Sequence, residues 1–229
     1  MFSVLFEVHP RGEQGDAYLG YAKMLRPELE GIDGFVDNIR YRSLTRPGWI
    51  LSLSNWRDEK ALVRWRTRAR HHEVQVKGRE EVLSDYHLRV GQITSDTHVP
   101  AGYRLEEQRL DLTETGEGSM VTLTNPLAPY EEMAIEESHA LEIAAALGLR
   151  TDADGLMSWD VFDAVLEPGN PILLRSWRDA AAAPQQIDDS AIRARHVRII
   201  RDYGMFDRRE TPQYYPEIVP QNAATSGSG

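Results

Sequence analysis

The sequence repeats two short segments in the same order. Trp-Arg-Asp occurs at Trp56–Asp58 and again at Trp177–Asp179, and Arg-Ala-Arg-His occurs at Arg68–His71 and again at Arg193–His196. One match of this length is common by chance, but an ordered pair of matches indicates an internal duplication. A chain of 229 residues has room for two small domains of roughly 100 residues each. The sequence therefore predicts two copies of one structural unit.

The first copy shows the order of elements of a ferredoxin-like unit. Apolar residues alternate in the segments expected to be strands and recur at helical spacing in the segments expected to be helices. Asp58 is placed to cap the second helix, which continues to about Lys77. The predicted elements are strands at Phe2–His9, Phe35–Leu44, Trp49–Trp56 and Tyr86–Thr94, and helices at Ala17–Leu29 and after Asp58. The order β-α-β-β-α-β is the ferredoxin-like motif.

The same order restarts after a linker that contains a possible strand at Tyr103–Leu112. In this second copy the predicted strands are Met120–Thr124, Leu156–Leu166, Ile172–Trp177 and His196–Met205, and the predicted helices are Glu131–Leu147 and Asp188–Arg195. The predicted organisation is a first domain at 1–97, a linker at 98–118, a more divergent second domain at 119–215 and a disordered tail at 216–229. The fold class is α+β.

Charge and cysteine content exclude several functional classes. Acidic residues outnumber basic ones by 36 to 26, which gives a net charge of −10 and argues against nucleic acid or an anionic membrane as the main partner. There are no cysteines, which removes disulfides and thiol chemistry and fits a cytoplasmic protein. The apolar start of the chain is too short for a signal sequence or a membrane span. A metal site is also unsupported, because no His-Glu-x-x-His pattern or similar pairing occurs.

The segment Gly31–Gln75 resembles the antibiotic biosynthesis monooxygenase family of dimeric α+β barrels. The resembling features are a glycine-led strand, a hairpin, a strand that ends in Trp and an acidic residue, and a helix that carries Trp and then His. The resemblance covers residues 2–95 well and 119–209 more weakly. It implies that the two copies pair their sheets inside one chain, as two subunits do in single-domain members, and that a homo-oligomer is possible.

The resemblance also implies a pocket between the helices and the sheet. On the predicted second helix, one stripe at spacings of three and four residues contains Trp65 and His72, with His71 beside it. Trp65 would form a wall of the pocket and His72 would be the base or proton relay. Asn38 and Arg89, on the second and fourth strands, would hold substrate oxygens. The structural alternatives are that Trp65 is core, that His72 is a boundary residue and that Asn38 lies on a solvated strand face.

Family members differ in chemistry, so the expected function has alternatives. The leading hypothesis is a monooxygenase that oxidises a small aromatic or polyketide-like substrate with dioxygen and without a dedicated cofactor. A second hypothesis is a haem enzyme with His196 as the axial ligand, although His196 equally fits a seam between domains. The haem-degrading branch is disfavoured, because Gln75 stands where that branch has a helix histidine. A third hypothesis is a non-catalytic binding or stress-response module.

Overall fold

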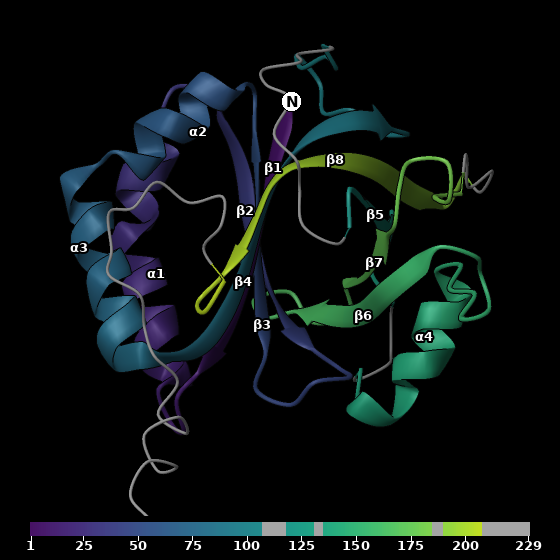
Figure 1. Cartoon of the computed structure of the whole chain (residues 1–229), viewed down its shortest axis with the longest axis horizontal. Helices are drawn as coiled ribbons and strands as arrows, with labels where there is room; N and C mark the ends of the chain where they lie inside the picture. The colour runs from purple at the N-terminus through teal and green to yellow at the C-terminus, as the bar shows by residue number, and fades with distance from the viewer. Residues whose placement is uncertain (107–117, 131–134, 185–189, 208–229) are drawn as a thin grey trace, which may run out of the picture.

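The computed structural model describes residues 1–106, 118–130, 135–184 and 190–207. Eight antiparallel strands close into a barrel in the order β1-β3-β2-β6-β7-β5-β8-β4 (Figure 1). The strands are β1 Phe2–Pro10, β2 Phe35–Ser43, β3 Ile50–Trp56, β4 Leu83–Asp96, β5 Met120–Pro126, β6 Leu156–Ala164, β7 Pro171–Trp177 and β8 Ile192–Gly204. The described helices are α1 Gly15–Glu30, α2 Glu59–Arg66, α3 Ala69–Lys77 and α4 Ala140–Ala146, with a π-helical turn at Gly78–Val82 and a 3-10 turn at Glu137–His139.

The barrel consists of two four-stranded halves with the same strand order. The first half runs β4-β1-β3-β2 and the second runs β8-β5-β7-β6, so each half has the neighbours of a ferredoxin-like sheet. Two seams join the halves, a long one between β4 and β8 and a short one in which Tyr41–Ser43 pairs with Phe162–Ala164. The predicted α+β class with two ferredoxin-like sheets forming a barrel is therefore confirmed, whereas the exact domain limits stay a prediction.

The repeated Trp-Arg-Asp segment forms the same local structure in both halves. The carboxylate of Asp58 accepts a hydrogen bond from the backbone N–H of Ala61 at 2.8 Å, and that of Asp179 accepts one from Ala182 at 2.9 Å. In the first half this bond caps α2, because the first turn of a helix leaves its N–H groups without partners. In the second half a turn follows Asp179 instead of a helix.

The second repeated segment does not occupy equivalent positions. Arg68–His71 begins α3, whereas Arg193–His196 lies within β8. The predicted short helix at Asp188–Arg195 is therefore wrong over its described part, because Ile192 already belongs to the strand. Pairing with β5 decides this, since β5 pairs with β8 from Ile192 to Arg198 and the β4 pairing joins from Arg195 onward. Local helical propensity is a weak prior against such pairing.

The long helix predicted after Asp58 is interrupted. It divides into α2 and α3 at Thr67 and Arg68, where Arg68 takes an extended conformation with ψ of 128°. The Thr67 hydroxyl donates to the carbonyls of Val63 and Arg64 at 3.0 and 3.2 Å, and such side-chain bonds compete with helix continuation. The stripe of residues predicted from one continuous helix therefore does not extend across this break.

Two further predicted elements fall partly outside the described residues. Of the helix predicted at Glu131–Leu147, the described part is a 3-10 turn followed by α4. Tyr103–Glu106 forms no strand, and the rest of that predicted strand, like the tail at 216–229, lies outside the described residues.

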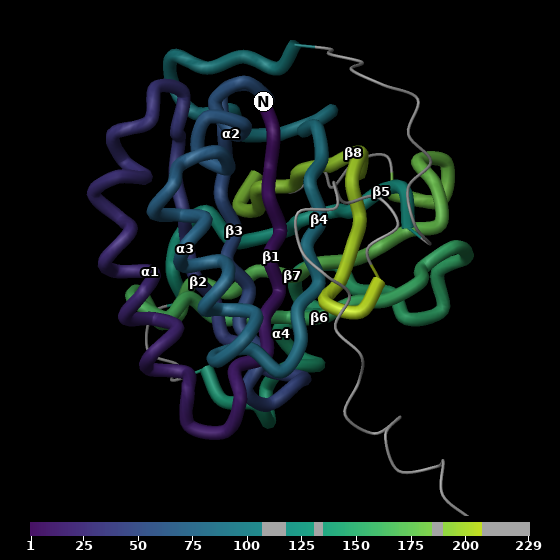
Figure 2. Tube along the Cα trace, turned by 60° about the vertical axis from the view of Figure 1, so that its left-hand side comes forward, coloured from purple at the N-terminus to yellow at the C-terminus, as the bar shows by residue number. Residues whose placement is uncertain are grey.

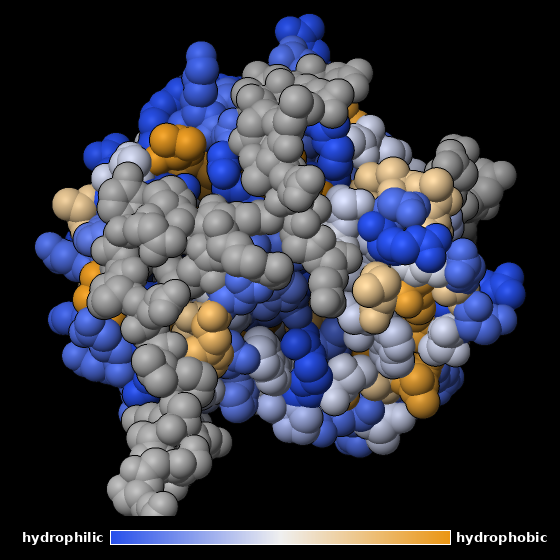
Figure 3. Space-filling model, in the orientation of Figure 1, coloured by the Kyte–Doolittle hydropathy of each residue, from blue (hydrophilic) through white to orange (hydrophobic). Residues whose placement is uncertain are grey.

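Side chains fill the barrel, and the helices cover it from outside. Apolar residues from all eight strands, such as Leu5, Leu51, Phe162 and Val197, form one buried cluster in the interior. Helices α1, α2 and α3 lie together over the outer face of the first half, and α4 covers part of the second (Figures 1 and 2). The face shown in Figure 3 is mostly hydrophilic with scattered apolar residues. None of the described helices has the length and apolarity needed to cross a membrane.

Candidate active site

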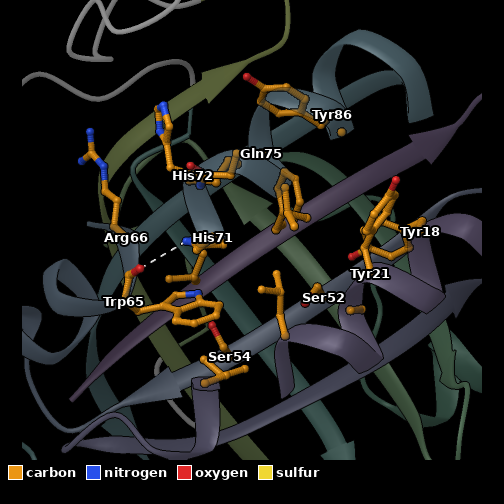
Figure 4. Close-up of a pocket in the computed structure, with 18 of the residues that line it drawn as sticks. Tyr18, Tyr21, Ser52, Ser54, Trp65, Arg66, His71, His72, Gln75 and Tyr86 are labelled. Atoms are coloured by element: carbon orange, nitrogen blue, oxygen red, sulfur yellow. Dashed lines mark hydrogen bonds between the residues drawn. The ribbon is translucent and has the colours of Figure 1, made fainter. Parts of the chain in front are cut away.

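A cavity of about 830 Å³ lies between the outer face of the first-half sheet and helices α1 to α3 (Figure 4). This volume is in the range of small-molecule sites. Apolar side chains line much of it, including Val4, Phe6, Ala22, Leu25, Leu29, Val74, Val82 and Leu88. Polar side chains interrupt this lining at a few places, and they determine what the cavity can bind and do.

At one end of the cavity the imidazole of His71 stacks on the indole of Trp65. The ring centroids are 4.3 Å apart and the planes differ by 21°. Nδ1 of His71 lies 3.2 Å from the backbone carbonyl oxygen of Trp65. A carbonyl can only accept, so Nδ1 carries the proton, and Nε2 is the acceptor of the ring. Trp65 is itself buried.

The environment of His71 keeps its ring neutral. Burial lowers the pKa of His71 to about 4, the hydrogen bond to the Trp65 carbonyl opposes that shift, and neighbouring His72 adds to it. At neutral pH the ring is therefore an uncharged base in a mostly apolar surrounding. The lone pair on Nε2 is free to accept a proton at neutral pH, but a pKa of about 4 makes the ring a weak base, so it suits a substrate whose anion the cavity stabilises.

The structure places His72 differently from the sequence-based expectation. His72 lines the cavity, but it is exposed to solvent and points away from the Trp65–His71 pair (Figure 4). His71, which the sequence placed beside the inner stripe, is the histidine packed on Trp65. The break between α2 and α3 reorients the second helix, and Thr67 is the one residue in the sequence that indicates it.

Asn38 lies in the cavity wall, within a polar corner. Its amide donates to Ser52 Oγ at 3.0 Å and to the Leu53 carbonyl at 3.2 Å. The Tyr18 hydroxyl, from α1, lies within hydrogen-bonding reach of Arg40 and Ser52. Burial raises the pKa of Tyr18, and the contacts with Arg40 and Ser52 oppose this only in part, so the phenol stays protonated.

Arg89 is not part of this cavity. It points into the barrel interior, where it forms a buried ion pair with Glu7 and donates to Ser176 Oγ at 2.6 Å. The alternation of β4 explains the difference, because Leu88 lies on the outer face and Arg89 on the inner one. The structure thus brings Trp65, His72 and Asn38 to one cavity and places Arg89 elsewhere.

Several cavity residues were not selected as site residues from the sequence. Tyr18 and Arg40 come from α1 and β2, and buried Arg79 donates to the Tyr86 hydroxyl at 2.7 Å. Arg40 shares the strand face of Asn38, so the period of two residues along β2 was a usable signal. Arg79 lies in the π-helical turn after α3, which no sequence pattern indicated.

His196 has surroundings that do not fit a haem ligand. Its Nε2 lies 2.7 Å from the Pro184 carbonyl oxygen, which requires a proton on that nitrogen. The neighbouring cavity has a volume of about 10 Å³, room for about one water molecule. Among the described residues no cluster of three or more His, Asp or Glu side chains could hold a metal ion.

A family model and a named relative both match this chain. Residues 1–77 match the model of the family described as antibiotic biosynthesis monooxygenase. A protein of Pyricularia oryzae named jasmonate monooxygenase ABM is 47% identical over 222 residues, which cover 94% of this chain and 99% of that protein.

Solved structures show a similar fold at low identity. An aldoxime dehydratase in complex with butyraldoxime has a TM-score of 0.53 at 12% identity, over 86% of this chain and 79% of that chain. Another aldoxime dehydratase structure has a TM-score of 0.51 at 14% identity, over 86% and 80%. At these identities the similarity concerns the fold alone.

Proposed function

The chain belongs to the antibiotic biosynthesis monooxygenase family, and on that premise we propose that it oxidises a small, mostly apolar substrate with dioxygen and without a dedicated cofactor. Aromatic and polyketide-like compounds are one candidate class. Jasmonate, which gives the relative from Pyricularia oryzae its name, is the other. The observation that carries the proposal is the Trp65–His71 pair at the end of a mostly apolar cavity of about 830 Å³.

The chemistry of the pair suits a substrate that has an acidic C–H or O–H group. Nε2 of His71 takes the proton, and the substrate anion then transfers electrons to dioxygen, which forms a carbon–oxygen bond. Return of the proton to the peroxide oxygen and loss of water convert a CH₂ group into C=O. One dioxygen is consumed, one oxygen atom enters the product, the other leaves as water, and all four electrons come from the substrate.

The remaining cavity residues orient the substrate and limit water access. The Trp65 indole offers a flat apolar wall, and the aliphatic lining from β1, β4 and α1 excludes water from the anion. The polar corner of Tyr18, Asn38 and Ser52 supplies donors to a substrate oxygen. The cavity beside His196 in the second half has a volume of about 10 Å³, so we assign the activity to the first half.

The proposal is tested by oxygen uptake and isotope labelling. Purified protein is incubated with jasmonate, with small phenols and with polyketide-like anthrones, each with and without a reductant such as NADPH. We expect at least one substrate to consume one dioxygen per product without the reductant and to gain one ¹⁸O atom from ¹⁸O₂ at early times.

Other results of this assay would revise or remove the proposal. If turnover requires the reductant, the protein is still a monooxygenase, but the substrate does not supply all four electrons. A cavity ligand that binds but never consumes dioxygen would favour a non-catalytic binding module instead.

A further inference from the structure

The cavity has the opposite charge to the chain as a whole. The net charge of the sequence is −10, but the cavity is lined by Arg40, Arg66 and Arg79 and, among the described residues, by a single carboxylate, that of Glu73. Arg40 and Arg66 form no ion pair with any carboxylate in the described part of the chain. A basic cavity in an acidic protein selects for anionic ligands, because it focuses the local field.

Arg40 is the cation with the most specific surroundings. It lies on the outer face of β2 within reach of the Tyr18 hydroxyl, which also contacts Ser52. Its Nε is shielded from solvent and has no hydrogen-bond partner among the described residues. Because buried N–H groups of proteins nearly always have an acceptor, this atom marks a place where an acceptor is expected.

This corner lies across the cavity from the proposed reaction site. In Figure 4, Tyr18 and Tyr21 are on one side, whereas Trp65 and His71 are on the other, with Ser52 on the cavity floor between them. A ligand held at the Arg40 corner would therefore extend through the apolar middle of the cavity toward the Trp65–His71 pair. That arrangement suits a molecule with a polar group at one end and an apolar body.

We propose that the substrate is a carboxylic acid and that Arg40, with Tyr18 and Ser52, binds its carboxylate, which directs the apolar remainder toward Trp65 and His71. The guanidinium of Arg40 and the hydroxyl groups of Tyr18 and Ser52 can all donate hydrogen bonds to a carboxylate. The only competing acceptors among these groups are the two hydroxyl oxygens. The protonated phenol of Tyr18 can donate to the carboxylate. The inference rests on the proposed function only in taking this cavity as the substrate site.

Binding measurements test the inference separately from turnover. Isothermal titration compares jasmonate with methyl jasmonate and dodecanoate with methyl dodecanoate, on the unmodified protein and on Arg40→Gln. We expect each acid to bind about 10- to 100-fold more tightly than its ester, as one charge-assisted contact provides, and Arg40→Gln to remove this preference. Arg150→Gln is the matched control, because it removes the same charge from an exposed side chain outside the cavity, and it should retain the preference.

The other outcomes contradict the inference. Equal affinity for acid and ester, a preference that persists in Arg40→Gln, or no binding of either acid at millimolar concentration would each overturn it. An acid preference with no oxygen uptake from any of the acids, phenols or anthrones would leave the inference in place and remove the proposed function. Equal affinity and equal turnover of acid and ester would do the reverse. Circular dichroism of Arg40→Gln and Arg150→Gln checks that both variants keep the fold of the unmodified protein.

Discussion

His71 packs on Trp65 although the two residues are six positions apart. In a continuous helix this separation would place them about 120° apart around the axis. The break at Thr67 and Arg68 reorients α3, so that the imidazole lies over the indole at 4.3 Å and bonds to the Trp65 carbonyl. The interruption of the helix thus creates the contact on which the proposed chemistry depends.

Substitution of the two neighbouring histidines should have different effects. His71→Ala removes the neutral base, and we expect kcat to fall about 100-fold or more, as general bases typically contribute. His72→Ala should lower kcat much less, because His72 is exposed and points away from Trp65. Steady-state oxygen uptake on both variants measures this difference, and an equal or larger loss in His72→Ala would restore His72 as the base.

The low pKa of His71 predicts a specific pH dependence of stability. In the unfolded chain the pKa of histidine is near 6.5, whereas burial lowers it to about 4 in the folded protein. Below about pH 6.5 the unfolded state therefore binds the proton more readily, and folding loses on the order of 3 kcal/mol between about pH 6.5 and 4.

Urea unfolding of the unmodified protein and of His71→Gln at a series of pH values isolates this contribution. The difference in unfolding free energy between the two proteins should change across that window and be constant above about pH 7. A difference that does not vary with pH would show that the folded protein does not depress this pKa.

Glu7 and Arg89 should matter for folding and not for substrate binding. Both are buried inside the barrel, where Arg46 also pairs with Glu7. Burial raises the pKa of Glu7, but Arg89 and Arg46 outweigh it and lower the pKa overall, so this contribution to stability is present above about pH 4.3 and is lost as the pH falls.

We expect Glu7→Gln to cost about 3–5 kcal/mol of unfolding free energy, because it leaves the buried guanidinium of Arg89 without a carboxylate partner, whereas the partly exposed Arg46 keeps its ion pair with Asp160. Glu30→Gln, which breaks the exposed pair with Arg26 on α1, should cost less than about 0.5 kcal/mol. Denaturant unfolding checks both values. A weakened ligand affinity in Arg89→Gln with unchanged stability would instead support Arg89 as a substrate contact.

Equivalent glycines precede the second strand of each half. Gly34 and Gly155 have φ of +89° and +76°, and a Cβ on either would lie 2.7 or 2.4 Å from the Cβ of Ala61 or Ala182. Gly34→Ala and Gly155→Ala should each destabilise the protein by more than about 1–2 kcal/mol, since the left-handed conformation alone costs that much. Gly20→Ala, in a helix with nothing near the added methyl, should stabilise by about 0.5–1 kcal/mol. Thermal unfolding of the three variants checks these values, and equal unfolding midpoints would contradict them.

The sequence sufficed for the fold where the local pattern and the tertiary structure agree. The alternation in β1 to β4, the Asp58 cap and the repeated Trp-Arg-Asp segment all predicted what is observed. It failed at Ile192–Arg195, where pairing with β5, joined by β4 at Arg195, overrides the predicted helix.

For the site, the resemblance to the family implied a cavity between helices and sheet but not its chemistry. Trp65 and Asn38 were found because a single helix or strand period places them. His71 was missed because its orientation depends on a helix break. Arg89 was misassigned because the alternation of a strand shows which residues share a face but not which face turns toward the cavity. Arg40 was not selected because its significance depends on α1, which brings Tyr18 beside it.

The most direct test of the account is a crystal structure of the protein soaked with jasmonate. We expect difference density in the first-half cavity, with the carboxylate at Arg40 and the apolar part against Trp65 and His71. Density confined to the barrel interior or to the second half near His196 would contradict the central claim that this outer cavity is the active site.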